Sequence, residues 1–183
     1  LKRKLNDAPS LASFDPTAKS YLYTDASQGG LGAVLKQGEG DEERTVLFLS
    51  RSLRGVEQGY SVIEKEALAV YWAVKKLKKF LWGTNFSVMT DQKPLCQTFK
   101  RKGLDLISGR IAKWVVSLQE YDFSVTYLPG VKNKIADSLS RLAALVTSGE
   151  SPGDESDEEE VEDEKVCTVQ QIITRDKWCE AIE

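Results

Sequence analysis

The chain has 183 residues, 41% of them hydrophobic, and a formal net charge of −3. It contains no histidine and only three cysteines, none in a Cys-x-x-Cys pair, which excludes Ser-His-Asp catalysis, Cys-His catalysis and histidine-ligated metal sites. Residues 1–142 hold 22 Lys and Arg against 15 Asp and Glu, whereas residues 143–183 hold 3 against 13. A basic body with an acidic tail is typical of a nucleic-acid-binding domain with an extension, although solvated surface charge explains it equally well.

The body of the chain, which we place at residues 20–142, is predicted to begin with three strands. Ser20–Ala26 alternates aromatic and smaller residues, as a half-buried strand does. The sequence Gln28-Gly29-Gly30 forms a turn into a second strand at Leu31–Lys36, so that the two strands make a hairpin. The third strand is Thr45–Ser50.

Helices and strands then alternate. From Ser61 to Leu81 apolar residues recur at helical spacing, and Gly83 is placed to end that helix. The remaining predicted elements are a strand, a short helix, a helix, a strand and a last helix, at Phe86–Thr90, Pro94–Phe99, Ser108–Glu120, Asp122–Tyr127 and Ile135–Leu142. Three strands followed by this alternation predict an α/β protein, a mixed sheet with helices on its faces.

The C-terminal part has a different composition. Residues 143–165 include a dense acidic run with almost no apolar side chains, which predicts a disordered linker because little surface can be buried there. Residues 166–183 regain apolar side chains, but the segment is too short to fold alone.

Two acidic residues stand in apolar surroundings. Asp25 is near the end of the first strand beside the Gly-rich turn, where a turn-forming Asp is the ordinary alternative. Glu66 falls within the apolar stripe of the first helix, where a carboxylate is costly unless it is paired or binds a metal. Glu64 lies about 200° away around the helix and fits a capping box with Ser61. We therefore predict that Glu64 caps the helix and that Glu66 is free for chemistry.

Two more acids occupy the ends of predicted elements. Asp91 directly follows a strand, and sites in sheets of this kind collect at the carboxyl ends of strands. The alternative for Asp91 is an N-cap of the helix that begins near Pro94. Asp137 lies at the start of the last helix, where a carboxylate is common for dipole reasons alone.

Together with their neighbours, these acids resemble the ribonuclease H domain of a gypsy-type retroelement reverse transcriptase. The similar blocks are YTDAS at 23–27, GLGAVL at 30–35, KEALAV at 65–70, FLWG at 80–83, TDQKPL at 90–95, LPG at 128–130 and NKIADSLSR at 133–141. They cover residues 1–142 in the order of that family. One departure is Gln92, where the family usually has His; this affects local positioning rather than metal binding.

The resemblance implies a fold, a cofactor and a set of catalytic residues. The fold is ribonuclease-H-like, with a five-stranded mixed sheet of three antiparallel strands and then two parallel ones, flanked by helices. The implied cofactor is a pair of Mg²⁺ ions, for which Mn²⁺ can substitute, held by the catalytic acids Asp25, Glu66, Asp91 and Asp137. Asp25 would bridge both ions, with Glu66 and Asp91 on the leaving-group side and Asp137 on the water side.

The implied activity is hydrolysis of the RNA strand of RNA/DNA hybrids. Selectivity would come from contacts to 2′-hydroxyl groups, for which Ser27, Gln28 and Ser61 are candidates, and Gln92 adjoins the third acid. The basic candidates for DNA-strand phosphates are Lys100, Arg101, Lys102, Arg110 and Lys113, and a solvated surface explains them equally well. The rival function is a non-catalytic ribonuclease-H-like module that binds or tethers, and the presence of all four acids disfavours it.

The flanking segments suggest a polyprotein. Residues 1–19 resemble the end of the polymerase part of a reverse transcriptase, and residues 166–183 resemble a lead-in to an integrase. We therefore expect a covalently linked polymerase, and an integrase, as partners, with an intracellular location in a cytoplasmic virus-like particle. The unpaired cysteines agree with a reducing compartment, and no apolar run approaches the roughly 18 residues that a membrane helix needs.

Overall fold

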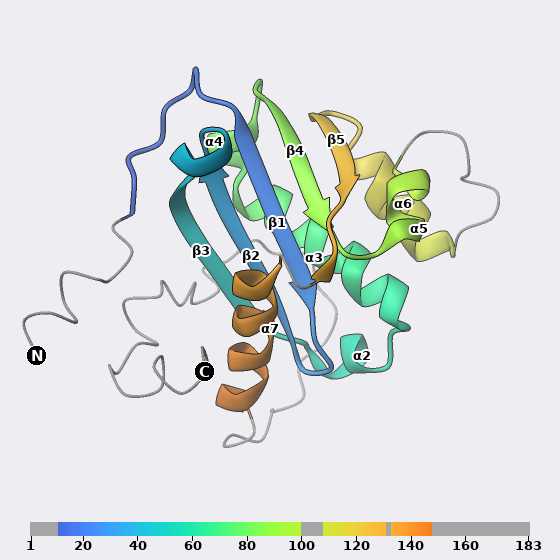
Figure 1. Ribbon diagram of the computed structural model, residues 1–183. Coiled ribbons are helices and arrows are strands. Elements are labelled where there is room, and N and C mark those ends of the chain that lie inside the picture. The colour runs from blue at the N-terminus through green and yellow to red at the C-terminus, as the bar shows by residue number, and fades with distance from the viewer. Residues whose placement is uncertain (1–10, 100–107, 131–132, 148–183) are drawn as a thin grey trace, which may run out of the picture.

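A mixed sheet forms the centre of the protein (Figure 1). The computed structural model describes residues 11–99, 108–130 and 133–147. The strands are β1 (Ser20–Ala26), β2 (Gly30–Gln37), β3 (Arg44–Ser52), β4 (Asn85–Thr90) and β5 (Asp122–Tyr127). Their order is β3-β2-β1-β4-β5; β1 and β3 both pair antiparallel with β2, and β4 pairs parallel with β1 and with β5. The predicted fold class is therefore confirmed.

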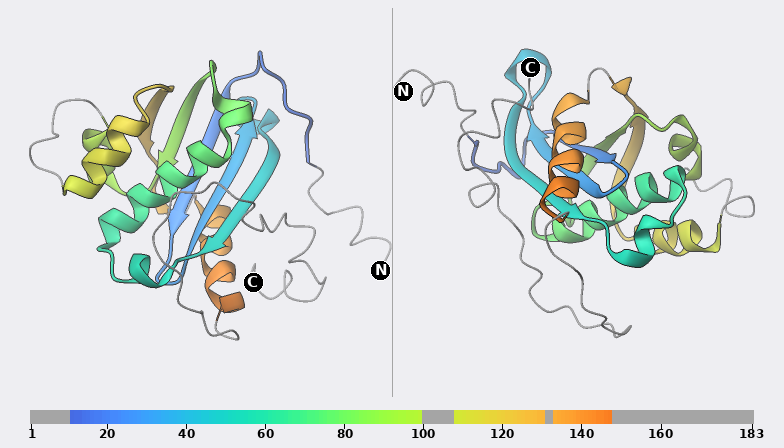
Figure 2. Two further views of the ribbon diagram at one scale, coloured as in Figure 1. Left: turned by 180° about the vertical axis from the view of Figure 1, so that it is seen from behind. Right: turned by 90° about the horizontal axis from the view of Figure 1, so that it is seen from below.

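Helices cover both faces of this sheet (Figures 1 and 2). The helical elements are η1 (Gly40–Glu42), α2 (Gly55–Gln58), α3 (Val62–Lys76), α4 (Lys78–Leu81), α5 (Lys93–Thr98), α6 (Gly109–Ser117) and α7 (Lys134–Thr147). Helix α7 contacts β1, β2 and β3 on one face, and α3 crosses the other face over β1 and β2. Helix α6 packs on α3 beside the β5 edge.

Some of the predicted helices differ from the structure. The helix expected from Ser61 to Leu81 is divided into α3 and α4, because Leu77 leaves helical geometry with φ −91° and ψ 15°. Neither glycine nor proline marks that break in the sequence. The last helix continues to Thr147 instead of ending near Leu142, and the small side chains of Ala143 and Ala144 in this extension lie close to Gly30 and Gly29. The short elements η1 and α2 were not predicted.

Two apolar layers result from the alternation of side chains along β1. Leu22 points into the main core between the sheet and α3, a cluster that also contains Val70 and Phe86. Tyr23 points to the opposite face and packs with the smaller cluster under α7, which includes Leu139. Asp25 lies two residues after Tyr23, so its side chain is on the same face of the strand. It therefore points toward α7 and not into the main core.

Helix α7 lies directly on the backbone of β2. A Cβ atom added to Gly32 would lie 2.3 Å from the carbonyl oxygen of Ala136 and 2.7 Å from the backbone nitrogen of Ser140. One added to Gly30 would lie 2.3 Å from the carbonyl oxygen of Ser140. Glycine is therefore required at both positions for this close approach, which brings the first turns of α7 beside the end of β1.

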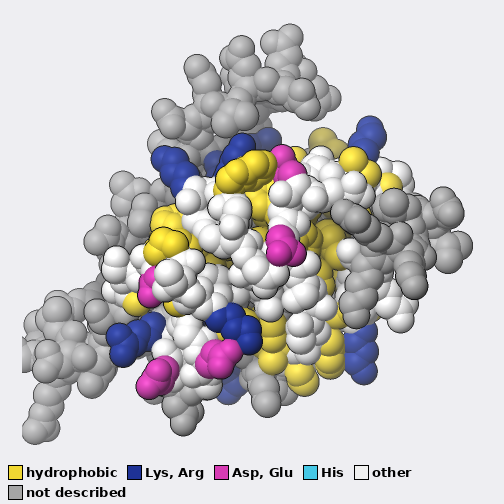
Figure 3. All heavy atoms as spheres, turned by 90° about the horizontal axis from the view of Figure 1, so that it is seen from above, with side chains coloured by type: hydrophobic (Ala, Val, Ile, Leu, Met, Phe, Trp, Pro, Cys, Tyr) yellow, Lys and Arg dark blue, Asp and Glu magenta, His cyan; other side chains and the backbone are white. Residues whose placement is uncertain are grey.

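Several sequence predictions fall outside the described ranges, namely those for residues 1–10, for the segments 148–165 and 166–183, and for Lys100, Arg101 and Lys102. Within the described residues, none of the helices combines the length and the apolar character that a membrane crossing requires. At the end of the sheet where β1 and β4 begin, basic and acidic side chains are interspersed on the visible face (Figure 3).

Candidate metal centre

The strand register places two acids side by side. In the parallel pairing of β1 with β4, Leu22 lies opposite Val88 and Tyr23 opposite Met89. Continuing the same register by two residues puts Asp25 opposite Asp91, just beyond the paired segment. Both carboxylates therefore stand at the carboxyl ends of neighbouring parallel strands, where sites in such sheets collect.

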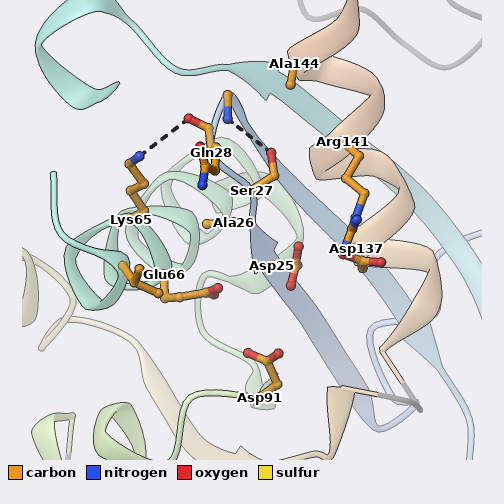
Figure 4. A pocket seen from close by; sticks show the side chains of 12 residues that line it. Asp25, Ala26, Ser27, Gln28, Lys65, Glu66, Asp91, Asp137, Arg141 and Ala144 are labelled. Atoms are coloured by element: carbon orange, nitrogen blue, oxygen red, sulfur yellow. Dashed lines mark hydrogen bonds and ion pairs between the residues drawn. The ribbon is translucent and has the colours of Figure 1, made fainter. Parts of the chain in front are cut away.

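A third carboxylate arrives from the other face of the sheet. Glu66 lies on α3 and is only 3% exposed, as its place in the apolar stripe predicts. One carboxylate oxygen from each of Asp25, Glu66 and Asp91 lies within 4.8 Å of the others. Figure 4 shows the three side chains pointing toward one another. The structure thus brings together three of the four predicted acids as one group.

Burial and mutual repulsion keep these carboxyl groups protonated to unusually high pH. Burial, together with the nearby charges of Asp25 and Asp91, raises the pKa of Glu66 to about 9. Burial likewise raises the pKa of Asp25 to about 6, against the hydrogen bond from Ser140 that lowers it. The pKa of Asp91 is also raised, chiefly by burial. Such a cluster requires protons or a cation.

Two oxygens in the cluster lack partners. Among the described residues, neither Oε2 of Glu66 nor Oδ1 of Asp91 accepts a hydrogen bond, although both atoms are buried. A buried polar atom without a partner is costly and calls for an explanation, such as an ion or a water molecule. Oxygen ligands of this kind, grouped at short range, are what a hard divalent cation such as Mg²⁺ prefers.

The fourth acid, Asp137, stands beside the group. It lies in the first turn of α7 and lines the same pocket as the other three. Its Oδ1 accepts a hydrogen bond of 2.7 Å from Nε of Arg141, one turn further along the helix, and both side chains are substantially exposed. Asp137 is therefore held by an ion pair at the rim of the site (Figure 4).

Helix caps and a turn were the structural alternatives for these acids. Ser61 is the N-cap of α3 and forms the capping box with Glu64, so the predicted capping role of Glu64 is confirmed, whereas the chemical role of Glu66 stays a prediction. Asp91 is not the N-cap of α5, because Gln92 occupies that position. The turn after β1 is closed by Ser27, whose backbone and hydroxyl pair with Gly30, and not by Asp25.

The pocket at the acids also includes two of the predicted substrate contacts. Ser27 and Gln28 line it from the β1–β2 turn. Lys65 and Arg141 line it as well, although neither was predicted as a site residue from the sequence. Their positions offered a signal: Lys65 directly precedes Glu66, and Arg141 lies one helical turn after Asp137.

The other predicted contacts lie outside this pocket. Ser61 is engaged in the cap of α3, and the backbone of Gln92 donates to Oγ1 of Thr90. Arg110 pairs with Glu64 at 2.7 Å and lies over the ring of Tyr60 at 4.0 Å. Ser61 and Arg110 therefore have structural partners of their own, whereas the contact of Gln92 is made by its backbone; a substrate contact of any of the three stays a prediction.

Comparisons with known proteins agree with this arrangement. The family described as "RNase H-like domain found in reverse transcriptase" matches residues 15–121. The Pol polyprotein of transposon 297 of Drosophila melanogaster is 38% identical over 144 residues, which cover 78% of this chain and 13% of the relative. The polyprotein of transposon Tf2-3 of Schizosaccharomyces pombe is 34% identical over 145 residues, covering 78% of this chain and 11% of that protein. The chain thus spans about an eighth of these relatives.

Solved structures share the fold at low sequence identity. LC11-RNase H1, which was isolated from compost, matches in its complex with an RNA/DNA hybrid with a TM-score of 0.56 and 17% identity, over 73% of this chain and all of that one. The foamy viral protease-reverse transcriptase with RNA/DNA hybrid matches with a TM-score of 0.54 and 17% identity, over 86% of this chain and 20% of that one. The family match, the similarity to gypsy-type polyproteins and the shared fold lead to one assignment. The chain belongs to the family of RNase H-like domains found in reverse transcriptase, and it is similar in sequence to Pol polyproteins of gypsy-type transposons.

Proposed function

We propose that this chain is an endoribonuclease that hydrolyses the RNA strand of RNA/DNA hybrids during reverse transcription. The observation that carries the proposal is the group of Asp25, Glu66 and Asp91, whose ligand oxygens lie within 4.8 Å of one another. Asp137 adds a fourth carboxylate to the same pocket. Membership of the RNase H-like family supports the reaction class, and two neighbours in fold were solved with RNA/DNA hybrid.

The residues present fit a magnesium centre. Three acids with raised pKa values and two unpartnered buried oxygens need compensating positive charge. We assign Asp25, Glu66, Asp91 and Asp137 as ligands of two Mg²⁺ ions, for which Mn²⁺ can substitute. Asp25 lies between the other acids and is the natural shared ligand. When bound, the ions supply charge stabilisation at the scissile phosphate and make a water molecule more acidic.

The protein's own contribution is to orient the four carboxylates and to exclude solvent from part of the site. Glu66 is shielded by α3 and the sheet, so its carboxylate acts in a region of low dielectric constant where electrostatic contacts are strong. Asp137 stands at the more open side, within reach of solvent. The chain has no histidine, so the proton released in hydrolysis is assigned to solvent and not to an imidazole.

Recognition of the hybrid is assigned to the rim of the pocket. Ser27 and Gln28 in the β1–β2 turn offer hydrogen-bonding groups for 2′-hydroxyls, which distinguish RNA from DNA. Lys65 and Arg141 supply positive charge on opposite sides of the acids (Figure 4). Arg110 remains the proposed contact to a DNA-strand phosphate, since its side chain is 43% exposed despite its ion pair. Ser61 and Gln92 keep a smaller proposed role, through hydroxyl and amide contacts at the edges of the site.

The nuclease is proposed to be one part of a longer polyprotein. The relatives are Pol polyproteins much longer than this chain. We propose that residues 1–19 continue from the polymerase and that the nuclease runs from residue 20 to the end of α7 at Thr147, beyond the boundary at residue 142 predicted from the sequence. The acidic remainder of residues 143–165, which lies outside the described residues, is proposed to be a linker. Residues 166–183 would lead toward an integrase. The proposed location is intracellular, in a cytoplasmic virus-like particle.

Cleavage of an end-labelled RNA/DNA hybrid in Mg²⁺ tests the function. Double-stranded DNA, double-stranded RNA and the Asp91→Asn variant serve as controls. We expect cutting of the hybrid alone and its loss in the variant, because Asn removes a charged ligand while keeping the shape. A folded protein that binds the hybrid without cutting it, in Mg²⁺ and in Mn²⁺, would overturn the enzymatic proposal and favour a binding module.

A further inference from the structure

Ser140 links α7 to the central acid of the cluster. Its side chain is fully buried, and its Oγ donates to Oδ2 of Asp25 at 2.7 Å. A second acceptor, the carbonyl oxygen of Asp137, lies 2.9 Å from the same Oγ. A hydroxyl has a single proton, and a carboxylate is the stronger acceptor. The proton therefore belongs to the bond with Asp25 whenever that acid is charged.

A neighbouring serine shows the ordinary behaviour. Ser138 lies on the same helix and donates to the carbonyl oxygen of Lys134 at 2.8 Å, a bond within its own helix. Such back-bonding is the usual use of serine in a helix interior. Ser140 differs because its hydroxyl reaches out of α7 to β1. The two serines form a matched pair of the same residue type on the same element.

The position of the Ser140 hydroxyl is fixed by its backbone. The close packing of α7 on Gly30 and Gly32 leaves no room for the helix to approach further. The carbonyl oxygen of Ser140 also accepts a hydrogen bond of 2.9 Å from Oγ of Ser27, in the turn that lines the pocket. The helix is thus attached both to the strand that carries Asp25 and to the turn beyond it.

We infer that Ser140 is a positioning residue for the metal centre, which orients the Asp25 carboxylate toward the site shared with Glu66 and Asp91. Its bond to Oδ2 fixes the plane of that carboxylate, and so fixes where the remaining lone pairs point. Because Ser140 and Asp137 lie on the same helix, this bond also ties the end of α7 that carries Asp137 to Asp25 on β1. This inference rests on the proposed function and deepens it, because groups that orient metal ligands tune affinity for the metal.

Metal binding without substrate provides the first test. Mn²⁺ is titrated calorimetrically into the wild-type chain and into the Ser140→Ala and Ser138→Ala variants. We expect the Kd for Mn²⁺ to rise about 10- to 100-fold in Ser140→Ala, the range typical for loss of a group that orients a ligand. Ser138→Ala should bind as the wild type does. Ser140→Cys keeps nearly the same volume with a weaker donor, and should give an intermediate Kd even where the alanine variant folds poorly.

Hybrid cleavage across a range of Mg²⁺ concentrations provides the second readout. In Ser140→Ala the midpoint for Mg²⁺ should move upward by a similar factor, and kcat should recover at saturating metal. An unchanged Kd with a reduced kcat at every metal concentration would overturn the inference and leave Ser140 a purely structural role. A wild-type chain that neither binds Mn²⁺ nor cuts would instead overturn the proposed function itself, and the inference with it.

Discussion

Asp25 and Glu66 reach the same point from opposite faces of the sheet. Asp25 comes from β1 on the side of α7, and Glu66 comes from α3, yet their ligand oxygens lie within 4.8 Å of each other. Two carboxylates at this range, both buried, repel each other unless a proton or a cation lies between them. Metal binding and the stability of the fold are therefore coupled.

Replacing Glu66 should affect cleavage and metal binding, whereas replacing Glu64 should affect the free energy of unfolding. Glu66→Gln is expected to remove hybrid cleavage and to weaken metal binding, with little change in the stability of the metal-free protein at pH 7, because Glu66 is already protonated there. Glu64→Ala should lower the free energy of unfolding by about 0.3–1.5 kcal/mol, because it removes both the N3 side chain of the capping box and the ion pair with Arg110. Cleavage assays and denaturant unfolding would measure both. Loss of cleavage in the two variants alike would contradict this division.

The stability of the metal-free protein should fall as the pH rises. Folding raises the pKa of Asp25 from 3.8 to about 6 and that of Glu66 from 4.5 to about 9. The folded state therefore holds more protons than the unfolded state between these values, and the stabilisation present at low pH is lost as the pH rises through the folded pKa values. Thermal unfolding in EDTA should show Tm decreasing from pH 6 to pH 9. Saturating Mg²⁺ should reduce or remove the decrease, because bound cations replace the protons; an equal decrease with and without metal would argue against a shared site.

Gly32→Ala tests the contact that brings α7 to the acids. The new Cβ would meet backbone atoms of Ala136 and Ser140, so the helix must move or the strand must bend. Overpacking of this kind costs about 1–3 kcal/mol, and we expect metal affinity to fall with it. Gly109→Ala is the matched control: its Cβ would have nothing within 4 Å, and a stabilisation of about 0.4–1 kcal/mol is expected. Equal unfolding midpoints for the two variants would show that the contact is not tight.

The salt dependence of hybrid binding tests the proposed role of Arg110. If its guanidinium contacts a phosphate, Arg110→Gln should reduce the slope of log K against log salt by about 1. Lys19→Gln removes the same charge at the far end of β1, where Lys19 pairs with Glu39, and should leave the slope unchanged. Binding is measured in EDTA to prevent cleavage. Identical salt slopes for the two variants would mean that Arg110 does not contact a phosphate and contributes only its contacts with Glu64 and Tyr60.

The sequence was sufficient for the sheet and for three of the acids as one group. Strand ends could be recognised from alternation and turns, which located Asp25 and Asp91, and helical geometry separated Glu66 from Glu64. The break at Leu77 could not be predicted, because no residue there disfavours a helix and only packing decides it. The same holds for Arg110, whose position over Tyr60 depends on how α6 packs against α3, and for Ser140, whose partner lies on a strand distant in the sequence.

The most direct test of the proposed function is strand-resolved cleavage of a hybrid whose RNA and DNA strands carry different labels, in Mg²⁺ and in EDTA. We predict that only the RNA strand is cut and only with metal. The products should carry 5′-phosphate and 3′-hydroxyl ends, because water and not the 2′-hydroxyl attacks the phosphate and the 3′ oxygen leaves. Cutting of the DNA strand, cutting in EDTA, or products with 2′,3′-cyclic phosphate ends would contradict it.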